Sequence, residues 1–343
     1  MEAIEKAVKL LPGFALALAI AAIAKLLESL LPIHLIGASV IALFIGMIIN
    51  CFWKPVELFS SGLKFTSKKI LKFAIILLGA SLNIGIILNV GRMSLCVMVF
   101  TLFTCFGIGH FVGKALKINW KLSNLISAGT GICGGSAIAA IAPAIDAEDT
   151  DIAYAMSATF LFDMAMIVLF PIMGKAMGLS DMAYGLWSGT AVNDTSSVVA
   201  AGYAFSEAAG DFATMVKLTR TLAIIPTVIT FALINAHLKR KEAGVNGETV
   251  KAKFSLTKII PWFILGFIAL AIINSFGVIP AAVSSGMKDV SKFLMVAALA
   301  AIGLNTSFKD MKKSGFAPML HGFIISALVV IVAIAVEYFM GIV

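Results

Sequence analysis

Apolar residues fill the chain in runs of about 20 residues, separated by short polar stretches. A run of this length is what an α-helix needs to cross the hydrocarbon core of a bilayer. The pattern therefore predicts an all-α polytopic membrane protein whose 343 residues form a single transmembrane domain with about eleven transmembrane helices. The predicted helices span residues 12–31, 36–53, 68–89, 92–113, 122–145, 152–174, 183–205, 211–236, 255–277, 289–307 and 315–341.

Lysine and arginine are distributed unequally between alternating loops. One set of loops holds nineteen of these residues, whereas the other set holds only Arg92, Lys288 and Lys292. Because basic residues accumulate in cytoplasmic loops, this asymmetry predicts a cytoplasmic N-terminus and an external C-terminus. The acidic stretches 146–151 and 207–211 are then both expected outside.

The composition agrees with this class and excludes others. Hydrophobic residues make up 60% of the chain, charged residues make up 13%, and the mean hydropathy is +1.04. The net charge of +8 does not indicate a nucleic-acid partner, because the basic residues are scattered through short loops. The four cysteines have no paired spacing, which argues against a disulfide framework or a zinc site. The sequence shows no nucleotide loop, metal cluster or nucleophile arrangement, so we expect no cofactor and no enzymatic activity.

A glycine cluster interrupts the predicted helix 122–145 near its middle, with four glycines in the seven residues 129–135. Glycines weaken a helix where lipid offers the backbone no replacement partners. We therefore predict a helix that is broken at mid-membrane and whose second half points its free N–H groups into a cavity. Close helix packing through small residues is the alternative. The candidate substrate ligands here are Thr130, Gly131, Cys133, Gly134, Gly135 and Ser136.

A second polar stretch interrupts the predicted helix 183–205, where six of the nine residues 189–197 are polar. Asn, Asp and Ser side chains compete with the helical backbone for hydrogen bonds. A second unwound region at the depth of the first is therefore expected. The candidate ligands here are Asn193, Thr195, Ser196 and Ser197.

Asp163, Asp194, Lys217 and Arg220 lie inside predicted membrane helices. Each charge costs at least about 3 kcal/mol at the bilayer centre unless it faces a cavity or a partner. In a structural interpretation, the two carboxylates simply neutralise the two cations. In a functional interpretation, Lys217 and Arg220 bind an anion, and protonation of the aspartates or ion binding to them drives transport.

Two internal sequence echoes indicate a repeat, but they imply different pairings. The first joins residues 60–62 with 284–286, and residues 79–83 with 302–305, in two helices that run in opposite directions. The second joins residues 129–130 with 189–190, and Asp151 with Asp211, in helices predicted to run the same way.

Our preferred arrangement is a five-plus-five inverted repeat, with residues 36–174 against 183–341 and helix 12–31 as an extra element. This order pairs the broken fifth helix with a tenth helix interrupted at residues 303–306. Asn305 and Thr306 would then line the opposite wall of the site.

These motifs also carry a resemblance to a known family. Residues 129–138 and 193–201, followed by 217–220, resemble the YeiH-like sulfate exporter family of conserved bacterial membrane proteins, over nearly the whole chain. The resemblance implies a multi-pass secondary transporter of the bacterial inner membrane. Its architecture would be similar to that of sodium/proton antiporters and bile-acid sodium symporters, with broken helices that cross between a core and a panel domain. By analogy with those architectures, we expect a homodimer.

Three functional hypotheses follow. The first is an exporter of a small sulfur oxyanion, such as sulfate, sulfite or an organosulfonate, coupled to a proton or sodium gradient by alternating access. The second is a cation/proton antiporter in which Asp163 and Asp194 form the ion site and Lys217 and Arg220 are structural. The third is a membrane sensor or scaffold that transports nothing. The expected partners are a small anion, a coupling proton or sodium ion, and the lipid bilayer.

Overall fold

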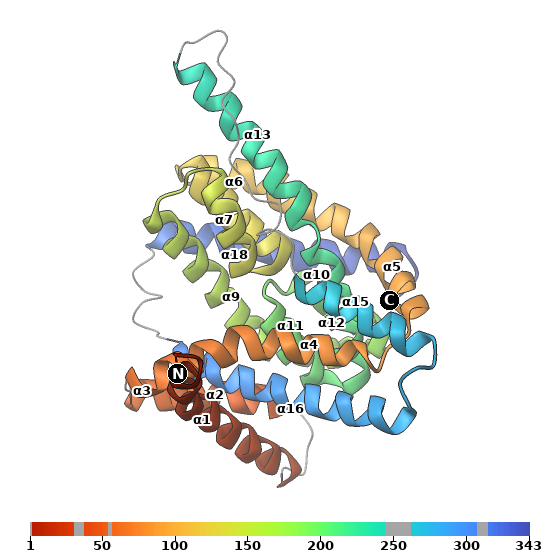
Figure 1. Ribbon diagram of the computed structural model, residues 1–343. Coiled ribbons are helices and arrows are strands. Elements are labelled where there is room, and N and C mark those ends of the chain that lie inside the picture. Colours follow the sequence, from red (N-terminus) through yellow and green to blue (C-terminus); the bar gives the residue numbers. More distant parts are fainter. Residues whose placement is uncertain (1, 31–37, 54–56, 244–261, 307–314) are drawn as a thin grey trace.

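A computed structural model describes residues 2–30, 38–53, 57–243, 262–306 and 315–343. The regular structure within these ranges is entirely helical (Figure 1). The helices are α1 (Glu2–Leu30), α2 (Ala38–Phe52), α3 (Glu57–Phe65), η1 (Thr66–Ile70), α4 (Leu71–Gly79), α5 (Ile84–Phe103), η2 (Thr104–Ile108), α6 (Gly109–Ala115), α7 (Trp120–Ala128), η3 (Gly129–Cys133), α8 (Gly135–Ile141), η4 (Ala142–Ala144), α9 (Asp149–Ala176), α10 (Asp181–Ala191), α11 (Thr195–Phe205), α12 (Glu207–Thr221), α13 (Ile224–Ala243), α15 (Trp262–Ser275), α16 (Ala281–Asn305) and α18 (Phe316–Phe339).

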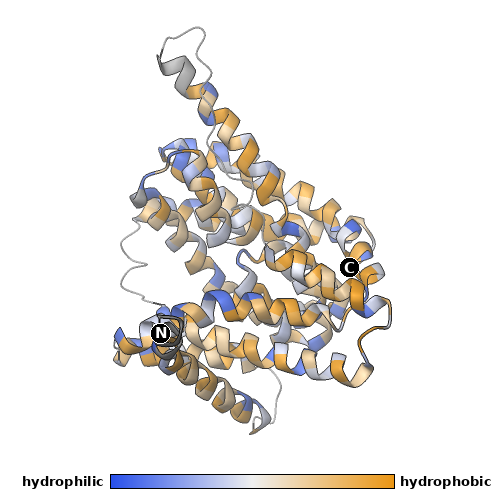
Figure 2. Ribbon diagram, in the orientation of Figure 1, coloured by the Kyte–Doolittle hydropathy of each residue, from blue (hydrophilic) through white to orange (hydrophobic). Residues whose placement is uncertain are grey.

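The predicted fold class is confirmed. Figure 2 shows hydrophobic residues along most of the length of the helices. Large apolar side chains also remain on the outer surface, and Phe103 and Phe111 are each 72% exposed, as suits contact with lipid. Within the described residues, five helices are long and apolar enough to cross a membrane, at residues 9–30, 84–115, 150–176, 207–238 and 316–339. The beginnings of the predicted helices 36–53 and 255–277, and the end of 289–307, lie outside the described residues.

Three predicted boundaries are wrong for the same reason. The third helical segment runs from Glu57 to Gly79 rather than over residues 68–89, α5 begins at Ile84 rather than at residue 92, and α16 begins at Ala281 rather than at residue 289. The sequence pattern places basic residues in loops, yet here Arg92 and the lysines at positions 64, 68, 288 and 292 lie inside helices. A long lysine side chain keeps its charged end in a polar environment while its stem packs along the helix, so a helix can continue through it.

The segment from α7 to η4 is a re-entrant hairpin, hereafter hairpin 1. Lys121, in the first turn of α7, donates from Nζ to the carbonyl oxygen of Asp146 at 2.7 Å. A straight helix between these residues would separate them by about 37 Å, at 1.5 Å per residue. The chain therefore enters and leaves on the same side, and residues 129–135 form its tip.

The segment from α10 to α11 is a second re-entrant hairpin, hereafter hairpin 2. Ser206, after α11, donates from Oγ to Asp181 Oδ1 at the start of α10, at 2.6 Å. Tyr184 on α10 donates from its hydroxyl to the Ala201 carbonyl at 2.9 Å and stacks on Phe205 with ring centroids 3.9 Å apart. The two arms are thus antiparallel neighbours.

Both predicted interruptions are confirmed, but the prediction that these two segments each cross the membrane is wrong. The long helix α9 connects the base of hairpin 1 to the base of hairpin 2, so the two hairpins enter from opposite sides. Residues 146–151 therefore lie on the side that holds Lys114, Lys117 and Lys121, here called the lysine-rich side, and residues 207–211 lie on the other. The prediction that both acidic stretches share one side is also wrong.

Paired contacts show how two groups of helices correspond. Asn50 on α2 donates its side-chain amide to the Leu304 carbonyl of α16, and Asn274 on α15 donates its amide to the Leu82 carbonyl after α4 at 3.2 Å. These are the same contact repeated, because residues 48–50 and 272–274 both read Ile-Ile-Asn and residues 82 and 304 belong to the first sequence echo.

Two glycine contacts repeat with the same spacing. A Cβ atom on Gly303 would overlap the Leu43 carbonyl, and one on Gly79 would overlap the Phe267 carbonyl, so both glycines permit close helix packing. Residues 43 and 267 are 224 positions apart, as are residues 79 and 303. The contacts therefore match α2 with α15, and α3 and α4 with α16.

The helices α4 and α16 pack antiparallel to each other. Ser284 and Ser291 of α16 donate from Oγ to the carbonyls of Ala80 and Ala74, so the residue numbers increase along one helix as they decrease along the other. This is the geometry expected of an inverted repeat.

The segments joined by the second echo also have opposite orientations in the structure, because the two hairpins enter from opposite sides. Hairpin 1 with α9 then corresponds to hairpin 2 with α12, about 60 positions later. α16 ends at Asn305, within the predicted interruption at residues 303–306, and the residues that follow Thr306 lie outside the described structure. This correspondence matches hairpin 1 with hairpin 2, whereas the predicted arrangement pairs the broken fifth helix with the tenth helix.

The helices form two groups in Figure 1. α1, α2, α3 and α16 lie together around an apolar cluster that includes Ala17, Ala42 and Val296, and α4 packs between α16 and α15. We call this group the panel. The two hairpins, α5, α6, α9, α12, α13 and α18 make up the other group, here called the core.

Candidate functional site

The tips of the two hairpins meet inside the molecule. Gly134 has φ +65° and ψ −135°, a conformation that essentially only glycine adopts, and it ends the first arm of hairpin 1. A Cβ atom at this position would lie 2.7 Å from Asp194 Oδ1 and 2.8 Å from Asp194 Cβ. Glycine is therefore required twice, by the backbone turn and by the close approach of hairpin 2.

Asp163 holds the tip of hairpin 2. Its carboxylate accepts the backbone N–H of Asn193 at 3.0 Å and that of Asp194 at 3.2 Å. Asp194 in turn caps α11, accepting from the Ser196 backbone N–H at 2.9 Å and from Ser196 Oγ at 2.5 Å. Two carboxylates thus face the N-terminal end of α11, where the partial positive charge of a helix favours them.

Arg220 joins the two hairpins through their backbones. Its Nη2 donates to the Thr130 carbonyl at 2.8 Å, its Nε to the Gly131 carbonyl at 2.5 Å, and its Nη1 to the Thr190 carbonyl. Lys217 donates from Nζ to the Val192 carbonyl at 2.9 Å. The final carbonyls of a helix have no intrahelical partner, so these two cations satisfy the ends of both first arms.

Both cations are buried, and their hydrogen bonds hold the two hairpins together. Lys217 is 0% exposed and Arg220 is 1% exposed. Among the described residues, no direct ion pair joins either cation to Asp163 or Asp194, so the predicted direct neutralisation is not the arrangement that forms. The charges instead balance through the backbone: the two cations contact carbonyl ends, and the two carboxylates contact N–H ends.

Only a small part of the place where the two hairpin tips meet, here called the crossing, is accessible. Gly135, Asp194 and Thr195 are partly exposed, and Ser136 is exposed, so these four residues present the surface of the two tips. The other predicted ligands of the tips are buried: Thr130, Gly131, Cys133, Gly134, Asn193, Ser196 and Ser197.

Asn305 and Thr306 are not brought to the crossing in the described structure. They end α16 in the panel, next to α2, where Asn50 binds the neighbouring Leu304 carbonyl. Thr306 is 7% exposed and donates from Oγ1 to the Ile302 carbonyl at 2.8 Å, whereas Asn305 is exposed.

One buried residue next to the tips was missed by sequence reasoning. Ser326 on α18 lies 3.5 Å from Thr130 Oγ1 and accepts from Asn193 Nδ2 at 3.4 Å, so it touches both hairpins. A single serine in an apolar helix carries little signal by itself. Its five-residue spacing from His321 on the same helix is the only hint in the sequence.

The family is shown by comparison with known proteins. The family model described as Conserved hypothetical protein 698 matches residues 12–322. The chain is 57% identical over 327 residues to a UPF0324 membrane protein of Clostridium tetani, covering 94% of this chain and 95% of the relative. The chain belongs to the UPF0324 membrane protein family. This result agrees with the resemblance drawn from the motifs.

Other UPF0324 relatives align along nearly their full length. One from Streptococcus pyogenes is 40% identical over 336 residues, covering 97% of this chain and 98% of the relative. One from Fusobacterium nucleatum is 40% identical over 328 residues, covering 90% and 92%. The alignments with these UPF0324 proteins therefore extend over the transmembrane domain and include both hairpins.

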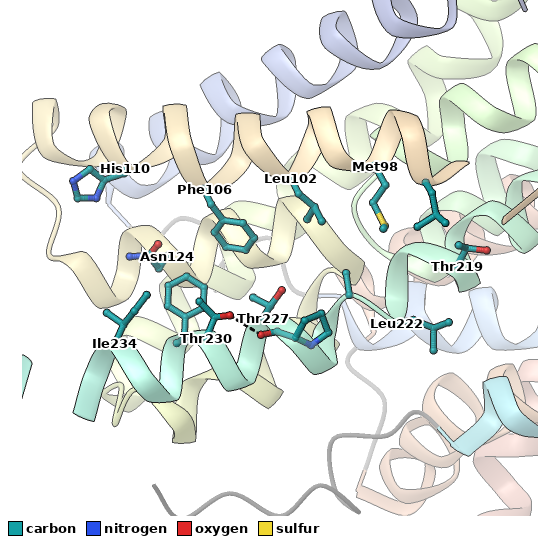
Figure 3. Close-up of a pocket in the computed structure, with 14 residues that line it drawn as sticks. Met98, Leu102, Phe106, His110, Asn124, Thr219, Leu222, Thr227, Thr230 and Ile234 are labelled. Carbon is teal, nitrogen blue, oxygen red and sulfur yellow. Dashed lines mark hydrogen bonds between the residues drawn. The ribbon is translucent and has the colours of Figure 1, made fainter. Parts of the chain in front are cut away.

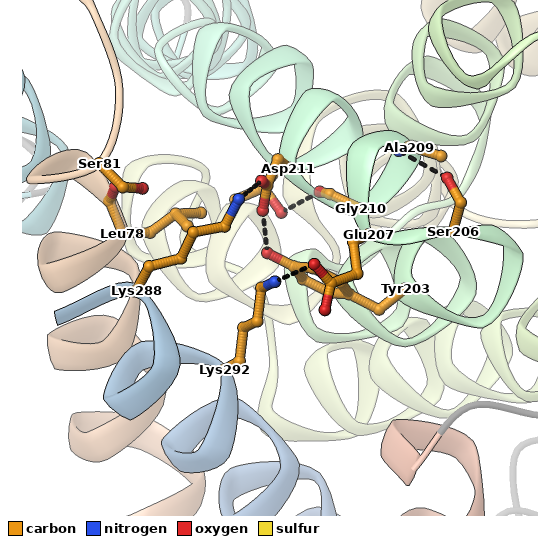
Figure 4. A network of polar contacts seen from close by, with 11 residues as sticks. Leu78, Ser81, Tyr203, Ser206, Glu207, Ala209, Gly210, Asp211, Lys288 and Lys292 are labelled. Atoms are coloured by element: carbon orange, nitrogen blue, oxygen red, sulfur yellow. Dashed lines mark hydrogen bonds and ion pairs between the residues drawn. The ribbon is translucent and has the colours of Figure 1, made fainter. Parts of the chain in front are cut away.

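Ion pairs join the panel of this UPF0324 protein to its core (Figure 4). Lys288 of α16 lies 2.6 Å from Asp211 of α12, and Lys292 lies 2.6 Å from Glu207. Tyr203 donates its hydroxyl to Asp211 at 2.5 Å. These contacts lie on the side opposite the lysine-rich side, since α12 begins there.

A separate groove of about 780 Å³ lies between α5, η2 and α13 of the UPF0324 chain (Figure 3). Its lining is largely apolar, with Leu102, Phe106 and Phe231 among the lining side chains, and it contains no acidic residue, lysine or arginine. It suits hydrocarbon rather than a small ion, so we do not assign the substrate to it.

Proposed function

We propose that this protein is a secondary active transporter that exports a small sulfur oxyanion by alternating access. The observation that carries the proposal is the two ion pairs between panel and core on one side, whose lysines have counterparts in the sequence on the other side. We interpret the two sets of residues as alternating gates. Lys288 and Lys292 belong to the sequence Ser-Ser-Gly-Met-Lys-Asp-Val-Ser-Lys, and Lys64 and Lys68 belong to Ser-Ser-Gly-Leu-Lys-Phe-Thr-Ser-Lys. Inverted repeats commonly exchange two such states in transporters.

The counterpart gate lies on the lysine-rich side. Asp151 on α9 corresponds to Asp211 on α12 through the second echo, and Lys64 corresponds to Lys288. Lys64 is exposed, and Asp151 accepts from Asn119 Nδ2 at 3.0 Å. No ion pair joins Lys64 to Asp151 in the described residues, and we propose that the lysine-rich side is the open one in this state.

The strength of these pairs suits a gate. The Lys288 side chain is 31% exposed and that of Asp211 is 11% exposed. A partly exposed pair contributes about 1 kcal/mol or less, so one pair can break and its counterpart can form without a large barrier. The core would then move relative to the panel and carry the two hairpin tips from one side to the other.

We assign the anion to the surface of the two hairpin tips. The N–H ends of α8 and α11 converge there and favour negative charge, and Ser136 and Thr195 supply hydroxyl groups. Asp194 would repel an anion bound beside it. Protonation of this carboxylate, or binding of sodium to it, removes the repulsion, and this mutual dependence is the physical basis of coupling.

Uptake into proteoliposomes tests the proposal. We expect labelled sulfate or sulfite to accumulate when a proton or sodium gradient is imposed, and Asp194→Asn to lose the dependence on that gradient. Glu148→Gln is a matched control, because Glu148 is an exposed carboxylate outside the tips. Absence of flux for every sulfur oxyanion tested, with folded protein in the vesicles, would refute the anion assignment.

A cation/proton antiporter is the second candidate, favoured by the partly exposed carboxylate of Asp194 beside the buried Asp163. Sodium flux against a proton gradient without any added sulfur anion, abolished by Asp163→Asn, would support it over the exporter.

A further inference from the structure

A row of buried polar side chains runs between hairpin 1 and α18. Ser123, Ser127 and Thr130 lie four and three residues apart, so they share one face of the first arm of hairpin 1. They are 4%, 1% and 0% exposed, respectively. On α18, His321 and Ser326 are both 0% exposed and face them. We call these five residues the seam.

The seam connects the lysine-rich side to the hairpin tips. His321 Nε2 lies 3.2 Å from Ser123 Oγ, near the beginning of α18. One to two turns further in, Ser326 Oγ lies 3.5 Å from Thr130 Oγ1 and accepts from Asn193 Nδ2. Asn193 donates its backbone N–H to Asp163. The row therefore ends at the carboxylate that holds hairpin 2.

Buried polar atoms remain unpaired along this row. His321 Nδ1, Ser127 Oγ and Asn193 Oδ1 are three of the five buried side-chain atoms without a partner in the described structure. Buried polar atoms are nearly always hydrogen-bonded, and a cluster of exceptions indicates ordered water. One of these atoms lies at each end of the row and one lies in its middle, so unpaired polar atoms occur along its whole length.

We propose that the seam is a hydrated proton pathway from the lysine-rich side to Asp163, and that a proton is the coupling ion. The inference rests on the proposed transport function. A proton from the lysine-rich side reaches the buried His321 through bridging water, and each hydroxyl or water along the seam accepts one proton and releases another. The last proton binds a carboxylate oxygen of Asp163 and converts it to a neutral carboxylic acid, so no other reactant is needed.

Protonation at this point has a mechanical consequence. The charged oxygens of Asp163 accept the backbone N–H groups of Asn193 and Asp194, and charge-assisted hydrogen bonds are about twice as strong as neutral ones. A neutral carboxyl group therefore loosens the tip of hairpin 2. The proton thus acts on the same tip that presents the substrate surface.

The charged groups around Asp163 are consistent with a proton that comes and goes. Asp194 on hairpin 2 carries a like charge and donates its backbone N–H to Asp163, whereas Lys217 and Arg220 on α12 carry the opposite charge and contact the same hairpin. Cys133 is the buried thiol at the tip of hairpin 1. At the other end, His110 and Lys114 of α6 are exposed, and no hydrogen bond joins either of them to His321 in the part of the chain that the structure describes.

Infrared spectroscopy of the full protein in lipid tests the pathway without requiring transport. The carboxylic acid band of Asp163 is identified by its loss in Asp163→Asn during a titration between about pH 4 and pH 8. After transfer to D2O, we expect this band to shift within seconds. Ser127→Val should slow the shift by at least about tenfold, because it replaces the unpaired hydroxyl with methyl groups that exclude water. His321→Gln, which cannot relay a proton, should slow it as well.

Ser94→Val is the matched control, since Ser94 is 2% exposed on α5 and lies outside the seam. Its exchange rate should equal that of the wild type. An Asp163 band that never appears, or equal exchange rates in the wild type, Ser127→Val and His321→Gln, would overturn the pathway. If the seam variants slow the exchange but the vesicles show no substrate flux, the proton pathway is supported and the transport proposal fails. If the seam variants exchange at the wild-type rate and the vesicles still show coupled flux, the transport proposal is supported and the pathway fails.

Discussion

Replacing Gly134 by alanine should destabilise the contact between the two hairpin tips. The backbone conformation alone costs about 1–3 kcal/mol for a residue with a side chain. The new methyl group would also lie 2.7–2.8 Å from Asp194 Oδ1 and Cβ, and 3.1 Å from its Cα. Overpacking of this kind costs about 1–3 kcal/mol more, because a backbone atom and a capping carboxylate cannot both move away. The total is about 2–6 kcal/mol.

Two other glycines separate these contributions. Gly178 has the same φ of +65° but nothing within 4 Å of its virtual Cβ, and Gly286 lies in α16 with open space around it. Gly178→Ala should cost about 1–2 kcal/mol from strain alone. Gly286→Ala should be neutral or stabilise by about 0.5–1 kcal/mol, because alanine loses less entropy in a helix.

Thermal unfolding of the three purified variants in detergent measures the difference. With a shift of about 2 °C or more per kcal/mol in large domains, Gly134→Ala should unfold several degrees below Gly178→Ala, and Gly286→Ala should match the wild type. If Gly134→Ala and Gly178→Ala unfold together, only backbone strain is present and the tips do not meet as described.

Further substitutions test the bracing, the gate and the topology. Arg220→Met should abolish the yield of monodisperse protein in size-exclusion chromatography, because it leaves three buried carbonyls without a donor at about 1–3 kcal/mol each; normal yield would contradict the bracing role. A double-mutant cycle of Lys288→Ala and Asp211→Ala should give a coupling energy of about 1 kcal/mol or less that falls with added salt, and additive effects would exclude the ion pair. Glu148→Cys and Glu207→Cys, with the native exposed cysteines replaced, should react with a membrane-impermeant maleimide from opposite sides, whereas labelling of both from one side would refute the hairpins.

Local sequence pattern predicted the breaks because their causes are local. The glycines at 129–135 and the polar residues at 189–197 weaken a helix wherever it lies. The same pattern could not show that the chain turns back. A spanning helix with a break and a re-entrant hairpin have the same length and hydropathy, and what separates them is a contact such as that of Lys121 with the Asp146 carbonyl, 25 residues away.

The internal repeat is a second feature that the sequence indicated and that the tertiary structure was needed to interpret. The two sequence echoes implied different helix pairings, because the second echo was assigned to helices that run in the same direction. Once the two segments are hairpins that enter from opposite sides, both echoes become inverted. The Asn50 and Asn274 contacts then supply the pairing that the sequence left open.

The sequence by itself determined the class of protein, the depth of the polar residues and the four charges that the site has to accommodate. These follow from hydropathy and from the cost of placing a charge in lipid, and neither depends on which helices are neighbours. Only the tertiary structure decided what each charge contacts. Arg220 and Lys217 bind the backbone carbonyls of two hairpins, and Asp163 binds backbone N–H groups, because the open ends of broken helices offer partners that are visible only when the tips are brought together.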